Sequence, residues 1–172
     1  MKLFIENMTE NIVHDLLNWK YEKPYDFYNN DLTDEEVKER LDGSYYALVD
    51  ERKELVGFFC IGETAQVPKG KQFGVYKDDF VDIGLGMNPK QIGKGNGVEF
   101  FSFILRTIEE KFKGTPIRLT VAKFNQRAIH LYTKLGFVME TEFNTDFAEF
   151  FTMVRKSRLI KHKEISSLKN GC

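Results

Sequence analysis

Asp82–Gly97 reads DIGLGMNPKQIGKGNG, and Asn125–Phe137 reads NQRAIHLYTKLGF; these two stretches are the most informative about the fold. In the first, a strand-like run leads into a turn with three closely spaced glycines, Gly93, Gly95 and Gly97. Glycines there remove the side chains that would keep a ligand away from the backbone. Apolar residues then recur at helical spacing over Val98–Phe112. The sequence therefore predicts a strand, a glycine-rich turn and a helix.

The start of this helix is a candidate anion site. Its first backbone N–H groups have no partner within the helix, and its dipole favours negative charge, so phosphate or pyrophosphate is the natural ligand. Lys94 adds positive charge. The turn does not match a Walker A loop, and it lacks the Gly-x-Gly-x-x-Gly spacing of dinucleotide-binding folds. Taken alone, it is equally compatible with a plain strand-to-helix loop.

The second stretch predicts a capped amphipathic helix. Asn125 is a good N-cap, and Gly136 is placed just after the C-cap. The apolar face of this helix is expected to hold Ala128, Leu131, Tyr132 and Leu135. On this evidence alone, Tyr132 is a core aromatic residue and Asn125 a helix cap.

With both stretches in this order, the chain resembles the GNAT superfamily of N-acetyltransferases over Tyr45–Arg155. The family pattern Asn-x-x-Ala-x-x-x-Tyr-x-x-Leu-Gly-Phe is complete in Asn125–Phe137. The resemblance implies an α/β (α+β) fold of the GNAT type, with a mixed central sheet of about six to seven strands flanked by helices. It also implies an enzyme that uses acetyl-CoA and releases CoA as a product.

The resemblance assigns cofactor-binding residues as well. It implies that backbone groups hold the pantetheine arm as an added strand would be held, at Leu85, Gly86 and Met87. The implied pyrophosphate loop is Ile92, Gly93, Lys94, Gly95, Asn96 and Gly97, and Asn125 is implied to bind the pantetheine amide. Ile92 departs from the usual Arg or Gln. Backbone amides do not depend on that side chain, so the phosphate cradle is still expected.

Two side chains are candidates for proton transfer. The resemblance implies that Tyr132 lies near the CoA sulfur, where a phenol can donate a proton to the departing thiolate. An alkyl ammonium, with a pKa of about 10.4, must lose a proton before it attacks a thioester. Asp82 is the first candidate base because many relatives carry an acidic residue there, and Glu63 is the reserve. Burial or a water relay is needed to make an Asp effective.

The acceptor is expected to be a primary amine of a small molecule, peptide or protein. Aromatic residues interleaved with carboxylates follow the first predicted helix, and Tyr25 and Tyr28 are the candidate substrate-binding residues. Rings and carboxylates suit an amine through cation–π contacts and charge pairing. The same rings equally suit the edge of a core. A non-catalytic acyl-CoA-binding or sensing module remains the alternative function.

Composition limits the other classes of function. The 172 residues suit one domain, expected over residues 1–156 and followed by a basic tail over 157–172. A net charge of −1 gives no bulk attraction to nucleic acid or an acidic membrane, and a cytoplasmic location is expected. Scattered His residues and two unrelated Cys residues predict no metal site. The oligomeric state is left open, and a homodimer is one possibility. The Phe-rich end of the chain suits either a dimer edge or a core, and it contains Phe143, Phe147, Phe150 and Phe151.

Along the chain, strand signals occur at Lys2–Glu6, Tyr45–Val49, Glu54–Ile61, Asp79–Met87, Ile117–Ala122, Val138–Asn144 and Glu149–Arg155. Two further helices are expected over Thr9–Lys20 and Thr33–Leu41. The segment Gly62–Lys77, with its proline and glycines, is predicted to be a mobile insert.

Overall fold

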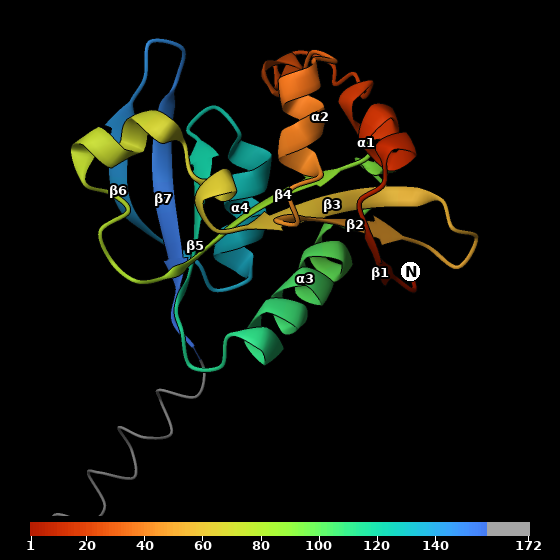
Figure 1. The fold of residues 1–172 in the computed structure, drawn as a ribbon. Helices are drawn as coiled ribbons and strands as arrows, with labels where there is room; N and C mark the ends of the chain where they lie inside the picture. The colour runs from red at the N-terminus through yellow and green to blue at the C-terminus, as the bar shows by residue number, and fades with distance from the viewer. Residues whose placement is uncertain (158–172) are drawn as a thin grey trace, which may run out of the picture. The chain divides into compact units, whose positions relative to one another are not determined.

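A computed structural model of the chain describes residues 1–157 and contains seven strands in the order β1-β2-β3-β4-β5-β7-β6 (Figure 1). The strands are β1 Phe4–Asn7, β2 Tyr45–Val49, β3 Leu55–Ile61, β4 Val81–Met87, β5 Ile117–Ala122, β6 Val138–Asn144 and β7 Glu149–Arg155. The helices are α1 Glu10–Leu17, α2 Asp34–Arg40, α3 Gly97–Lys111 and α4 Gln126–Lys134. Short 3-10 helices occur at η1 Tyr25–Tyr28, η2 Glu63–Ala65, η3 Pro68–Phe73 and η4 Pro89–Gln91. The predicted mixed sheet flanked by helices is confirmed.

The chain divides into two compact units. Unit 1 is Met1–Ala65 with Gly84–Phe101, and unit 2 is Gln66–Ile83 with the chain from Ser102. The division falls within β4 and α3, which each contribute residues to both units. A single domain over residues 1–156 stays a prediction, and the basic tail from residue 158 onward lies outside the described residues.

In unit 1, β1, β2 and β3 form an antiparallel sheet. Alternate residues of β3 point to opposite faces. The ring of Phe58 lies 6.2 Å from that of Trp19, which follows α1, whereas the α-carbon of Gly57 faces the Phe100 ring of α3. Thr9 and Thr33 cap α1 and α2 through their side-chain oxygens.

Strand β3 lies against β4 at closely packed glycines within unit 1. A Cβ on Gly57 would stand 2.5 Å from the carbonyl oxygen of Gly86 and 2.5 Å from the Phe100 ring. A Cβ on Gly86 would in turn clash with the Phe58 ring. The two glycines therefore allow a backbone approach that no larger residue permits.

In unit 2, β5 pairs in parallel with β4 at Val81–Ile117 and Asp82–Arg118, and antiparallel with β7 over its full length. Strands β6 and β7 form a hairpin, seen in blue in Figure 1, with a bulge between Met139 and Thr141. The Phe-rich end divides between core and surface. Phe143 and Phe150 are buried with Val75 and Ala122, while Phe147 is 88% exposed at the hairpin turn.

The prediction of a mobile insert over Gly62–Lys77 is wrong. The segment forms η2 and η3, and Gly70 is buried so closely that a Cβ would meet the rings of Tyr76 and Phe143. The amide of Val67 donates to the Tyr76 hydroxyl at 2.9 Å. Long-range side-chain contacts, which glycine and proline content does not reveal, give this segment its structure.

Replacing Gly57 by Ala is expected to destabilise the protein by about 1–3 kcal/mol, because the added methyl group overpacks the contact with Gly86 and Phe100. Chemical denaturation monitored by circular dichroism measures the change. Glu51→Ala, in the exposed β2–β3 turn, is the control and should shift stability by less than about 0.5 kcal/mol. Equal stability of Gly57→Ala and the unaltered protein would show that the contact is looser than described.

Candidate active site

The glycine-rich turn in unit 1 has the backbone shape of an anion site. Gly93 and Gly95 both adopt the left-handed conformation, with φ of 78°. Nothing lies within 4 Å of where a Cβ would stand on either, so glycine is favoured there by its backbone angles and the turn has open space around it. Left-handed residues that alternate along a turn direct neighbouring amides into one concavity, which suits an anion.

Helix α3 follows this turn directly and runs for 15 residues from Gly97. The amide of Phe100 donates to the carbonyl of Asn96 at 2.9 Å, so the amides of residues 97–99 precede the first bond within the helix. Lys94 is exposed beside them, and Ile92 is half-buried. The donors present here, backbone amides with one lysine, fit the pyrophosphate of CoA without a side chain at Ile92.

The end of β4 is held by side chains of unit 1. The Tyr21 hydroxyl donates to the carbonyl of Met87 at 2.9 Å. One residue further on, the Asn88 amide donates to the carbonyl of Val56 at 2.8 Å, and its side chain donates to the carbonyl of Leu55 at 2.9 Å. The strand predicted to hold pantetheine, Leu85–Met87, therefore ends at a fixed point.

Unit 2 contains the other predicted residues, on and beside α4. The Asn125 side chain accepts from the amide of Ala128 at 3.1 Å, which confirms it as the N-cap. Tyr132 is 9% exposed, with its ring 6.2 Å from that of Phe137. Gly136 has a φ of 90°, as its predicted place after the helix requires. Roles in cofactor binding and proton donation stay predictions for Asn125 and Tyr132.

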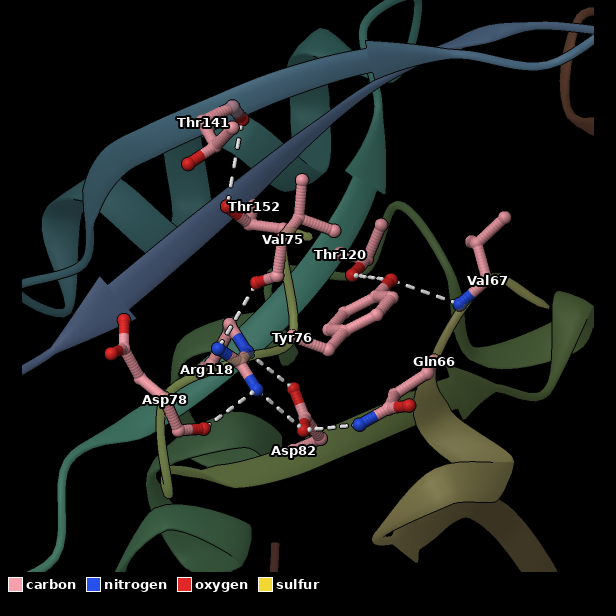
Figure 2. Close-up of polar contacts among 10 residues, drawn as sticks. All are labelled: Gln66, Val67, Val75, Tyr76, Asp78, Asp82, Arg118, Thr120, Thr141 and Thr152. Atoms are coloured by element: carbon pink, nitrogen blue, oxygen red, sulfur yellow. Dashed lines mark hydrogen bonds and ion pairs between the residues drawn. The ribbon is translucent and has the colours of Figure 1, made fainter. Parts of the chain in front are cut away.

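Asp82 belongs to a buried ion pair, which Figure 2 shows. Its carboxylate accepts from Arg118 Nε at 2.6 Å and from Arg118 Nη2 at 2.9 Å. Gln66 Nε2 donates to the same carboxylate at 2.8 Å. Asp82 is 5% exposed and Arg118 only 1%, so this bidentate pair lies in the interior of unit 2.

This arrangement disfavours the role of base for Asp82. A proton accepted by Asp82 would leave the buried guanidinium of Arg118 without its counter-charge, which is costly in an interior. Burial works to lower the pKa of Arg118, but the hydrogen bonds and charge of Asp82 outweigh it and the net pKa is raised. Arg118 thus stays a cation that needs Asp82 as an anion.

Arg118 also organises the segment that precedes β4. Its Nη1 donates to the carbonyl of Val75 at 3.1 Å, and its guanidinium lies 5.1 Å and 5.3 Å from the ring centres of Tyr76 and Phe80. The Tyr76 hydroxyl bonds to that of Thr120 at 2.8 Å (Figure 2). Sequence reasoning did not single out Arg118, although a lone charge within the apolar strand Ile117–Ala122 was the available signal.

The remaining candidates lie in unit 1. Glu63 is exposed at the start of η2. Tyr25 and Tyr28 are half-buried in η1, where the Tyr28 ring meets that of Phe27 edge to face at 5.3 Å. Trp19 is instead buried against Val13, Leu16 and Leu17. The aromatic segment after α1 therefore divides into a buried beginning and a more accessible end.

Cys60 does not have the properties of a nucleophile. It is buried in β3, and burial raises the pKa of its thiol to about 12, so the thiolate is scarce at neutral pH. Within residues 1–157, no group of three His, Cys, Asp or Glu residues is arranged to hold a metal ion. Over the same residues, no helix has the length and apolar character to cross a membrane.

Asp82→Asn and Arg118→Met are each expected to destabilise the protein by about 3–5 kcal/mol, because each leaves a buried charge without its counter-charge. The double variant Asp82→Asn/Arg118→Met should lose less than the sum of the two, since no charge remains buried. Urea denaturation of the four proteins measures this coupling. A stable Asp82→Asn protein that has lost only its turnover would restore Asp82 as a base.

Comparison with known proteins gives a consistent family. Residues 11–137 match the acetyltransferase (GNAT) family. A structure of a putative GNAT-family acetyltransferase from Bordetella pertussis has a TM-score of 0.70 at 18% identity, covering 89% of this chain and 95% of that one. No curated protein sequence matches the chain.

A chimera of the spermidine N-acetyltransferase SpeG from Vibrio cholerae with hSSAT has a TM-score of 0.65 at 19% identity, covering 91% of this chain and 96% of that one. An acetyltransferase of the GNAT family from Bacillus anthracis has a TM-score of 0.66 at 16% identity, covering 91% and 95%. At these identities the structures show a shared fold, and the family match extends over most of the chain. The chain therefore belongs to the acetyltransferase (GNAT) family, whose members are N-acetyltransferases that use acetyl-CoA.

Proposed function

We propose that the protein transfers an acetyl group from acetyl-CoA to a primary amine, by direct attack in a ternary complex. The observation that carries the proposal is the turn at the start of α3, where two left-handed glycines and the first helical amides offer donors to a pyrophosphate. Membership of the GNAT family supplies the reaction class. The complete motif of Asn125–Phe137 adds a tyrosine suited to proton donation.

In this proposal, the backbone of Leu85, Gly86 and Met87 binds pantetheine, and the loop Ile92–Gly97 binds pyrophosphate. Asn125 contributes its side chain to the pantetheine amide. When bound, acetyl-CoA supplies an acetyl group activated as a thioester. The two glycines of β4 that pack against β3 favour a fixed backbone here, since Gly84 and Gly86 lie against Cys60 and Phe58.

Two proton transfers fall to side chains of the protein. Formation of the amide N–C bond releases a proton from the amine, and cleavage of the C–S bond requires a proton for sulfur. Tyr132 Oη donates the second of these. For the first, the buried pair of Asp82 with Arg118 leads us to prefer Glu63 or a water relay, because neither choice removes the counter-charge of Arg118.

We propose a small polyamine-like molecule as the first acceptor class to test. Solved structures with the same fold include spermidine N-acetyltransferases. The chain from Glu22 to Glu39 carries seven carboxylates and two lysines. Glu36 and Glu39 are ion-paired with Arg40, and the other five carboxylates favour a guest with several positive charges. Tyr25 and Tyr28 lie within this segment and offer ring faces to an ammonium group. Peptide and protein amines are the competing acceptors.

The test is thiol release from acetyl-CoA with a panel of polyamines, small amines and peptides, together with calorimetry of CoA binding. Amine-dependent release would support the proposal and identify the acceptor class. Tight CoA binding without turnover on the whole panel would favour a sensing module instead. An absence of CoA binding would overturn the cofactor assignment.

Tyr132→Phe is expected to reduce kcat by about 10²–10⁴-fold while CoA binding changes little, because only the proton donor is lost. Steady-state kinetics and calorimetry on the same preparation separate the two quantities. Tyr46→Phe, which removes a phenol hydroxyl from β2, is the matched control. A kcat within twofold of the unaltered enzyme would exclude Tyr132 as the acid.

Tyr25→Ala and Tyr28→Ala are expected to raise the acceptor KM by about three- to tenfold with the acetyl-CoA KM unchanged, since a cation–π contact contributes about 0.5–2 kcal/mol. Initial-rate kinetics with each substrate varied in turn measures both constants. An unchanged acceptor KM in both variants would assign these rings to packing.

A further inference from the structure

We propose that Tyr21 is a positioning residue that couples the acceptor-bordering segment, residues 20–30, to the end of the cofactor-binding strand β4. The coupling rests on the proposed binding of acetyl-CoA along Leu85–Met87. Its structural basis is one hydrogen bond within unit 1, from the Tyr21 hydroxyl to the carbonyl of Met87, across 66 residues of sequence.

The contact joins two groups that are both half-buried. Its length of 2.9 Å is that of a well-formed hydrogen bond, and the donor is unambiguous because a carbonyl only accepts. Burial raises the pKa of Tyr21, so the phenol keeps its proton and stays a donor throughout the neutral range. The bond is therefore present under the conditions in which the enzyme would work.

Two contacts hold Tyr21 in place, one through its backbone amide and one through its ring. Its backbone amide donates to the side chain of Asn29 at 2.7 Å, which closes the segment between them into a loop around η1. The Tyr21 ring packs against the buried cluster of Val13, Leu16, Leu17 and Trp19. The loop is thus linked to Tyr21 by the hydrogen bond between the Tyr21 amide and Asn29, and the ring of Tyr21 is kept in one place by the cluster.

A second set of contacts also connects the chain after α1 to β4. The Trp19 ring lies 6.2 Å from the Phe58 ring, and Phe58 fills the space above the Cα of Gly86. The segment after α1 therefore contacts β4 directly at Met87, through the Tyr21 hydrogen bond, and indirectly at Gly86, through the Phe58 ring of β3. Both residues belong to the stretch assigned to pantetheine.

The carbonyl of Met87 has two lone pairs, and Tyr21 uses one of them. Tyr21 thereby fixes the direction of the carbonyl before a ligand arrives and lowers the ordering cost of adding a strand-like arm to β4. A ligand on β4 should in turn steady Tyr21 and the loop closed by Asn29, since coupling between two sites is reciprocal.

Hydrogen–deuterium exchange with CoA as the probe tests the coupling. In the unaltered protein, CoA should slow exchange at residues 85–97 and also at residues 20–30. In Tyr21→Phe, the slowing at residues 85–97 should persist while that at residues 20–30 is lost. Calorimetry should show the Kd of CoA raised about three- to tenfold, the effect of one hydrogen bond.

Tyr46→Phe is the matched control, because it removes the same hydroxyl from a ring stacked on Phe59 in the same unit; it should leave both exchange changes intact. If Tyr21→Phe fails to fold, Asn29→Ala serves as the second variant, since it releases the Tyr21 amide and should also abolish the slowing at residues 20–30.

Two outcomes would overturn the coupling alone: CoA binds but residues 20–30 do not respond in the unaltered protein, or they respond equally in Tyr21→Phe. Failure of the unaltered protein to bind CoA would overturn the cofactor assignment and the coupling together. Binding without slowed exchange at residues 85–97 would relocate the cofactor and exclude the proposed role of Met87.

Discussion

The ion pair of Asp82 with Arg118 is the interaction on which unit 2 depends. The two residues are also register partners on β4 and β5, so one bidentate contact joins two parallel strands whose other register pair is Val81 with Ile117. A guanidinium that is 1% exposed needs several acceptors; the carbonyls of Val75 and Asp78 supply them from the segment before β4, and the Asp82 carboxylate supplies them from β4 itself. The burial of both groups is sufficient to explain why Asp82 pairs with Arg118, without a role in acetyl transfer.

In unit 1, the structure orients backbone groups rather than side chains. Its left-handed glycines, its packed glycine contacts and the hydrogen bonds at Met87 and Asn88 all leave main-chain groups in defined directions. Such groups carry no net charge and do not titrate, so recognition built on them varies little with pH. The departure at Ile92 from the usual Arg or Gln is compatible with such a site, because backbone donors do not depend on that side chain.

The sequence predicted the fold well wherever the signal was local. Four strands, β2, β5, β6 and β7, have the bounds that alternation and flanking turns indicated, and Asn125 and Gly136 delimit α4 as their residue types predict. Prediction failed where partners are distant in sequence. Arg118 stands 36 residues from Asp82, and Tyr76 reaches Thr120 across 44, so neither the ion pair nor the packed segment around η3 follows from local composition.

The close fit of Phe58 over Gly86 has a consequence for how this enzyme can diversify. The volume that a side chain on β4 would occupy already belongs to a neighbouring strand, so a larger residue at position 86 is accessible only after position 58 has become smaller. In homologous sequences, the side-chain volumes at these two positions should therefore covary, with a larger residue at one position accompanied by a smaller residue at the other. In laboratory evolution, a library that varies position 86 alone would therefore sample mostly clashing variants, whereas a library that varies positions 58 and 86 together would give access to larger residues on β4.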